Sequence, residues 1–152
     1  MSRKTAFYIF LILLVLCAFF LVTGSPLLEK PILREPLFPA GAIIAWVGIL
    51  ALPASIYFGI ENIYTPRTKP HRAYNLILKI LTVLALLWGL VCFALADNWN
   101  FSFKNQEPFR GSTRASVYFW YFNAMVVLVP LVFLAVYGVH GVITTLQKKR
   151  SQ

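Results

Sequence analysis

Three ionisable side chains lie where long apolar stretches of the chain begin or end, and these residues are best placed to do chemistry. Glu61 and His140 stand near the ends of such stretches, and Lys79 stands a short way inside another. A carboxylate in contact with an imidazole can relay protons, because histidine changes its charge near neutral pH. Charged side chains at a membrane boundary are more commonly groups that reach out to water. We therefore predict a polar cluster of Glu61, Lys79 and His140, with proton relay as the alternative interpretation.

The patterns that catalytic and cofactor sites require are missing from the sequence. It contains no Ser/His/Asp or Cys/His arrangement, no H-E-x-x-H, no glycine-rich phosphate loop and no pair of carboxylates within an apolar stretch. Cys17 and Cys92 belong to no metal-binding spacing. His71 and His140 do not form a pair within the apolar stretches that could ligate a haem from both sides. We expect a protein that is not an enzyme, with no catalytic residue, cofactor or metal.

Apolar and aromatic residues are concentrated in two segments between the apolar stretches. From Pro26 to Phe38 proline recurs every five residues, which prevents a regular helix and leaves leucines on an extended strip. From Trp99 to Lys104 aromatic residues alternate with polar ones, which places the rings on one side. A belt of aromatic residues at the membrane interface explains this pattern, and a contact site for a partner protein or a lipid is the alternative. The candidate contact residues are Leu28, Leu33, Trp99, Phe101, Phe103, Tyr118 and Trp120.

Four long apolar stretches must position these residues, and they define the class of protein. The chain of 152 residues is 59% hydrophobic and 12% charged, against about 45–50% and about 25% in soluble domains. Each stretch has the roughly 20 residues needed to cross a membrane, and Lys79 is the only charged residue inside them. We predict an all-α integral membrane protein, a bundle of four transmembrane helices that forms one domain over residues 1–152. The predicted helices are 5–23, 38–60, 76–96 and 116–144, joined by loops 24–37, 61–75 and 97–115.

Lysine and arginine are distributed unevenly between the two sides of this arrangement. The two termini and loop 61–75, together with Lys79, carry nine of these residues, whereas loops 24–37 and 97–115 carry five. Because positive residues are enriched on the cytoplasmic side, both termini and loop 61–75 are predicted to be cytoplasmic. We expect a multi-pass protein of the bacterial inner (plasma) membrane. The net charge of +9 then reflects contact with anionic lipids, and we expect no binding of nucleic acid.

Small residues recur on one face of the second and of the third predicted helix. Gly48 and Gly89 lie on these faces, where small side chains let helix backbones approach closely. We therefore expect these two helices to form a tight antiparallel hairpin, while the first helix faces lipid or a partner. Pro53 and Pro130 each remove a backbone hydrogen bond in mid-membrane, which predicts kinks in the second and fourth helices.

No motif in the sequence specifies a function, so the expectation rests on architecture and surface. The apolar outer segments and the missing site chemistry favour a non-enzymatic accessory or structural subunit, or an assembly protein, of a larger membrane complex. The alternative is a small carrier or binder of a lipid-like molecule or quinone. A further alternative is an immunity-type protein that binds the transmembrane helices of another protein. The expected partners are thus membrane lipids and other membrane protein subunits.

Overall fold

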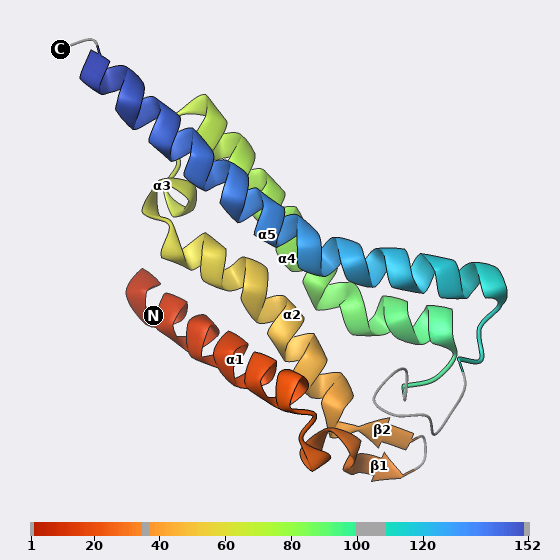
Figure 1. Ribbon diagram of the computed structural model, residues 1–152. Helices are drawn as coiled ribbons and strands as arrows, with labels where there is room; N and C mark the ends of the chain where they lie inside the picture. Colours follow the sequence, from red (N-terminus) through yellow and green to blue (C-terminus); the bar gives the residue numbers. More distant parts are fainter. Residues whose placement is uncertain (1, 35–36, 100–108, 151–152) are drawn as a thin grey trace.

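Long helices dominate the computed structural model, which describes residues 2–34, 37–99 and 109–150 (Figure 1). A single turn of helix, α3, lies between α2 and α4, and a 3-10 turn, η1, with two short strands connects α1 to α2. The start of α1 and the end of α5 lie at one end of the molecule, called here the terminal end, and β1 and β2 lie at the other, the hairpin end. The elements are α1 (Arg3–Thr23), η1 (Pro26–Glu29), β1 (Pro31–Arg34), β2 (Leu37–Pro39), α2 (Ala40–Gly59), α3 (Glu61–Tyr64), α4 (Lys69–Ala96) and α5 (Thr113–Arg150).

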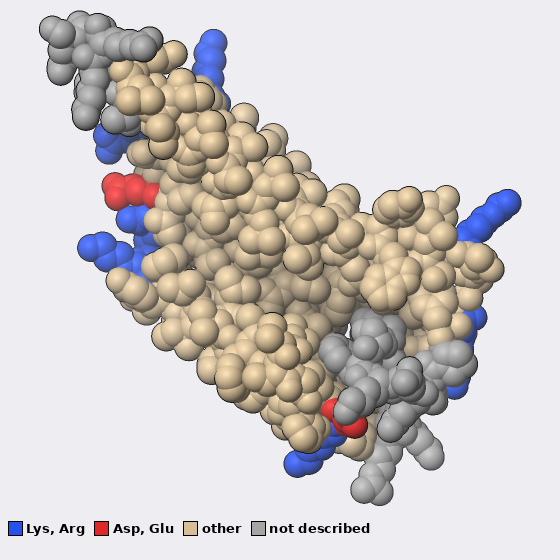
Figure 2. All heavy atoms as spheres, in the orientation of Figure 1, with Lys and Arg blue, Asp and Glu red and all other residues tan. Residues whose placement is uncertain are grey.

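The four predicted helices are all present. Within the described ranges, α1, α2, α4 and α5 are long and apolar enough to cross a membrane, which is consistent with a multi-pass membrane protein. Figure 2 shows Lys and Arg side chains projecting from the two ends of the molecule, with a broad band free of charged side chains across the middle of this face. This distribution agrees with apolar spans whose polar ends reach the interfaces.

The connection predicted as a loop over residues 61–75 is shorter than expected and partly helical. α3 occupies its start, and α4 begins at Lys69 rather than at residue 76. Pro70 helps to explain the early start, because proline in the first turn of a helix has the required backbone torsion and gives up no helical hydrogen bond. α5 likewise extends beyond the predicted range 116–144 at both ends. Hydropathy locates the apolar part of each helix, whereas the polar end turns carry no such signal.

Residues 24–39 fold back on themselves at the hairpin end. The hydroxyl of Ser25 accepts a hydrogen bond from the backbone N–H of Leu27 and so caps η1, in which Pro26 is the first residue. β1 and β2 then pair antiparallel, with Leu33 opposite Phe38. The extended strip expected from the prolines is therefore found in β1, whereas residues Pro26–Glu29 form a 3-10 turn.

α2 contacts each of the other long helices and is the most buried of them. Half of its apolar span is buried, compared with 11% of the span of α1. α1 packs along α2, where the Cβ of Cys17 faces Gly48 and the ring of Phe10 stacks on Phe58 with centroids 5.6 Å apart. The expectation that Gly48 faces the third predicted helix is therefore wrong. A face of small residues shows that some helix approaches closely, but it does not identify which one.

α4 packs on α2 through the side chain of Trp46. The indole N–H donates hydrogen bonds to the backbone carbonyls of Ala85 (3.2 Å) and Leu86 (3.0 Å) in α4. The indole also lies over Gly89, where an added Cβ would stand 2.5 Å from the ring. The ring can approach the α4 backbone this closely because glycine has no side chain. The predicted place of Gly89, at the contact between the second and third predicted helices, is confirmed.

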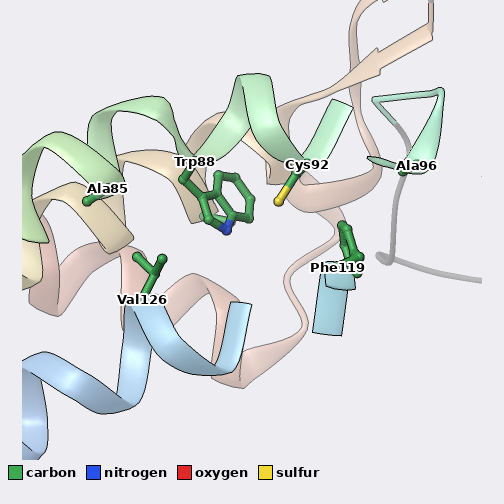
Figure 3. Packing of buried hydrophobic residues seen from close by; sticks show 7 residues of the cluster. Ala85, Trp88, Cys92, Ala96, Phe119 and Val126 are labelled. Carbon is green, nitrogen blue, oxygen red and sulfur yellow. The ribbon is translucent and has the colours of Figure 1, made fainter. Parts of the chain in front are cut away.

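α4 and α5 enclose an apolar core that contains a polar link (Figure 3). Trp88 and Cys92 extend from α4 toward Val126 and Phe119 of α5. The indole N–H of Trp88 donates to Oδ1 of Asn123 at 2.9 Å, and Nδ2 of Asn123 donates to the Phe119 carbonyl at 2.7 Å. A partly buried amide among apolar groups needs such partners, so this link favours one register of α4 against α5.

Replacing Gly89 by alanine should destabilise the protein, because the new methyl group would overlap the indole of Trp46. The hydrogen bonds of the indole resist a shift of the ring, so we expect a loss of about 1–3 kcal/mol, the usual cost of overpacking. The thermal midpoint of the protein in detergent measures this loss. Gly138→Ala is the matched control: an added Cβ there meets nothing within 4 Å, so stability should stay the same or rise. Equal midpoints for the two variants would contradict the importance of the contact.

Candidate functional site

At the hairpin end, Trp99 lies within a cluster of aromatic rings. α4 ends at Ala96, and the left-handed backbone of its cap residue Asp97 (φ 56°) turns the chain so that Trp99 folds back onto the helices. The Trp99 ring centroid is 4.5 Å from that of Phe93 in α4 and 4.9 Å from that of Phe38 in β2. It also stacks at 6.5 Å on Trp46 of α2. Trp99 therefore joins the β-hairpin to the ends of two helices, which is a structural role.

Of the six other predicted contact residues, the structure describes four, of which one is buried and three are exposed. Leu28 is 6% exposed, because η1 packs against α2 and α1, so this leucine belongs to the interior. Leu33 is 55% exposed, and Tyr118 and Trp120 are each 64% exposed. Phe101 and Phe103 lie outside the described residues. Leu33, Tyr118 and Trp120 are therefore the predicted contact residues that the structure places on the surface of the hairpin end.

At the terminal end, Glu61 pairs with Arg3. Oε2 of Glu61 lies 3.1 Å from a guanidinium nitrogen of Arg3. The same guanidinium donates hydrogen bonds to the backbone carbonyls of Phe58 (3.3 Å) and Gly59 (3.4 Å), at the end of α2. A cation beside the last carbonyls of a helix is favourable, because these groups carry the negative end of the helix dipole. Arg3 thus joins the start of α1 to the end of α2.

The other two members of the predicted polar cluster lie elsewhere. The ring of His140 lies against Tyr74, with centroids 5.9 Å apart, and the side chain of Lys79 is exposed on α4. Within the described part of the chain, no hydrogen bond or ion pair joins Glu61 to Lys79 or His140. A proton relay from Glu61 to His140 has no direct path in this geometry.

Sequence reasoning missed a cluster of rings at the terminal end, formed by His71 and Tyr74 of α4 with Tyr137 and His140 of α5. The Tyr74 centroid lies 5.5 Å from that of Tyr137, and the His71 centroid lies 6.1 Å from that of Tyr137. The signal was present as His-x-x-Tyr in one helix and Tyr-x-x-His in the next. Residues three apart share a helix face, and antiparallel neighbours reverse the order. Assigning residues 61–75 to a loop concealed this match, because a loop has no helical face.

This ring cluster holds the start of α4 against α5, and neighbouring contacts reinforce it. The hydroxyl of Thr68 hydrogen-bonds to Nδ1 of His71, and Nδ2 of the buried Asn75 donates to the backbone carbonyl of Ile63 at 2.7 Å. Imidazole and phenol groups both donate and accept hydrogen bonds, so the cluster can offer polar contacts to a ligand at the interface. Among the residues that the structure describes, no group of three or more His, Cys, Asp or Glu side chains is arranged to hold a metal ion.

The chain has no match among protein-family models, curated proteins or solved structures. Its candidate functional residues are therefore those that the geometry brings to the surface. At the hairpin end these are Leu33, Tyr118 and Trp120. At the terminal end they are the ring cluster and the exposed basic residues around the start of α4.

Arg3→Gln should destabilise the protein more than Glu61→Gln, because Arg3 contacts both Glu61 and the last carbonyls of α2. The Glu61 side chain is 70% exposed, so losing the ion pair alone should cost less than about 1 kcal/mol. Losing the hydrogen bonds to the carbonyls should add about 1 kcal/mol. Thermal midpoints in detergent would measure both effects, and Lys4→Gln, at an exposed neighbour, is the control that should change nothing. If Arg3→Gln and Glu61→Gln lower the midpoint equally, Arg3 does not cap α2.

Proposed function

We propose that this chain crosses the bacterial inner membrane four times as a helix bundle, with both termini in the cytoplasm. The terminal end carries Arg3 and Lys4, the basic residues at the start of α4 and the run Lys148–Arg150. The segments of the hairpin end contain four of the five acidic residues of the chain. Positive residues are retained on the cytoplasmic side, so this distribution supports a cytoplasmic terminal end.

Cysteine labelling in intact cells tests the orientation. Lys30→Cys at the hairpin end should react with a membrane-impermeant maleimide, whereas Arg67→Cys at the terminal end should react after the membrane is permeabilised. Cys17 and Cys92 are buried and should stay unlabelled. Labelling of both new cysteines from outside, or a reversed pattern, would rule out the proposed orientation.

In this arrangement Pro53 and Pro130 kink α2 and α5 in mid-membrane. Both prolines are buried inside their helices, and each lacks the N–H that would bond to the carbonyl four residues earlier. The apolar span of α5 has 32 residues, or about 48 Å of helix, which exceeds a hydrocarbon core of about 30 Å. A kink lets part of such a helix tilt away from the bilayer normal. The kink at Pro130 therefore allows the long apolar span of α5 to fit within the hydrocarbon core.

The function that the geometry supports best is that of a non-enzymatic accessory subunit or assembly protein of a larger membrane complex. The observation that carries this proposal is the β1–β2 hairpin, whose Ile32 and Leu33 are 53% and 55% exposed. The pairing of β1 with β2 is irregular between Pro31 and Leu33, so Ile32 lies at a bulge-like position beside Leu33, and the two side chains present apolar surface on β1. The sheet has two strands within the described residues, which leaves each strand with an outer edge able to pair with a strand of a partner.

Aromatic side chains position this hairpin at the membrane surface. Tyr118 and Trp120 are exposed near the start of α5, and such residues favour the headgroup layer because their rings are apolar and their N–H or O–H groups are polar. Trp99 and Phe38 attach the hairpin to the helices at the same end. The hairpin is thus held where an extramembrane segment of a neighbouring subunit would meet it.

The double variant Ile32→Ser/Leu33→Ser should release the partner while leaving the chain folded, because both side chains are exposed. The full chain, purified from its native membrane in a mild detergent, should migrate as a complex of defined stoichiometry in native electrophoresis. The double variant should migrate as the free chain with an unchanged thermal midpoint. Leu86→Ala, at an exposed apolar position of α4, is the control that should remain in the complex.

Two outcomes would contradict this function or its site. A native chain that purifies as a monomer with a bound lipid or quinone would overturn the accessory function and favour a carrier. If the double variant stays in the complex, the hairpin does not make the contact. The contact would then be assigned to the helix surfaces, as the immunity-type alternative requires.

A further inference from the structure

One face of α4 is exposed along most of the helix and carries positive charge near one end only. Lys69, Arg72 and Lys79 are exposed in the first three turns of the helix. The exposed apolar residues on the same face are Leu76, Ile80, Val83, Leu87 and Leu90. With 3.6 residues per turn, all these positions fall within about 100° of arc. This face is called here the outer stripe of α4.

The outer stripe is turned away from the rest of the chain. The opposite face of α4 makes the contacts with its neighbours, because Gly89 lies under the indole of Trp46 in α2 and Trp88 donates to Asn123 in α5. Among the residues that the structure describes, no hydrogen bond or ion pair involves the side chains of the three cations in the stripe. Any partner of these cations therefore comes from outside the described chain.

Lys79 is the residue of the stripe that points to a ligand. It lies about 15 Å beyond Lys69 along the helix axis, inside an apolar stretch. Ionisable residues in membrane-spanning segments usually face the interior of the protein, whereas Lys79 is exposed on the outer face. Helix side chains tilt toward the N-terminus of the helix, so Lys79 extends toward Arg72 and the headgroup layer. An anion at that level would lie between these two cations.

The chain provides no anion of its own for this stripe. α4 contains no Asp or Glu, and Glu61, the acidic residue at the terminal end, is already paired with Arg3. The complement of the positive charge is therefore an external anionic group at the membrane interface.

The shape of the stripe favours a lipid over a helix of another protein. Helices that pack tightly in membranes meet through small residues, as the opposite face of α4 does at Gly89. Between Leu76 and Leu90 the outer stripe contains no glycine, alanine or serine, and its apolar side chains are all large or branched. A flexible acyl chain can follow such an uneven surface, whereas a rigid helix is kept at a distance by it.

We infer that the outer stripe of α4 binds a phospholipid with an anionic headgroup. The phosphate lies between Arg72 and Lys79, and an acyl chain runs along Val83 and Leu87 toward the middle of the bilayer. The inference rests on the membrane insertion proposed above, and it is independent of the partner contact at the β-hairpin. The stripe has the same polarity as such a lipid, positive near the interface and apolar beyond it.

Competition between two lipids tests this site. The full chain is equilibrated in detergent micelles containing equal amounts of phosphatidylglycerol and phosphatidylcholine with the same acyl chains. Native mass spectrometry should show phosphatidylglycerol, the anionic lipid, retained in preference to phosphatidylcholine. Each cation near an anionic lipid contributes about fivefold in affinity, so Arg72→Gln/Lys79→Gln should lower the affinity for phosphatidylglycerol by roughly 25-fold. The thermal midpoint should not change, because both side chains are exposed.

Two control variants separate the outer stripe from the general charge of the terminal end. Lys4→Gln/Arg67→Gln removes the same charge at exposed residues of that end that lie outside the stripe, so the preference should remain. Arg72→Lys/Lys79→Arg keeps both charges on the stripe and should retain the preference as well.

Enlarging the apolar part of the stripe distinguishes a lipid from a helix. Val83→Phe should leave the preference for phosphatidylglycerol unchanged, because an acyl chain adapts to a bulkier side chain at this exposed position. A helix packed against the stripe would be displaced by the larger ring.

Three results would overturn the inference. The first is equal retention of the two lipids by the native chain. The second is an equal loss of affinity in Arg72→Gln/Lys79→Gln and in Lys4→Gln/Arg67→Gln, which would show a response to total charge. The third is a complex with another chain that is lost in Val83→Phe and persists in Arg72→Gln/Lys79→Gln, which would assign the stripe to a transmembrane helix.

Discussion

The close approach of α2 to its neighbours is the contact on which the rest of the structure depends. In lipid, helices gain little by burying apolar side chains, so they associate through tight packing and polar contacts. Cys17 against Gly48 brings α1 onto α2, and Trp46 against Gly89 brings α4 onto α2. The hydrogen bond from the Trp46 indole to the Leu86 carbonyl adds direction to the second contact. These two contacts fix the positions of α1 and α4 relative to α2. They therefore also fix which helix ends lie close enough to be connected.

The two ends of the molecule present different chemistry because different structural elements form them. At the hairpin end, η1 buries Leu28 while β1 presents Ile32 and Leu33 at the surface. At the terminal end, the ring cluster holds the start of α4 against α5. The proposed partner contact and the ring cluster lie at opposite ends of the helices.

Some contacts in this arrangement could be predicted from sequence patterns, and others could not. Gly89 was recognised as a contact residue because small residues recur along its helix, but the same argument assigned Gly48 to the wrong neighbour. A small residue permits a close approach without specifying the helix that makes it. Trp99 was recognised as part of an aromatic segment, yet its packing against Phe93 depends on the turn at Asp97. That turn sets the direction of the chain after α4, which alternation of aromatic residues does not encode.

The sequence by itself determined the number of long apolar helices, their approximate ranges and the uneven distribution of charge between their ends. These properties are sums over neighbouring residues, so they can be read along the chain. The tertiary structure alone decided that Arg3 caps α2, that Leu28 is buried and that His71 and His140 join one ring cluster. Such contacts depend on the rotation and the level of one helix relative to another. Many small packing contacts set that relation together, and no single stretch of sequence contains them.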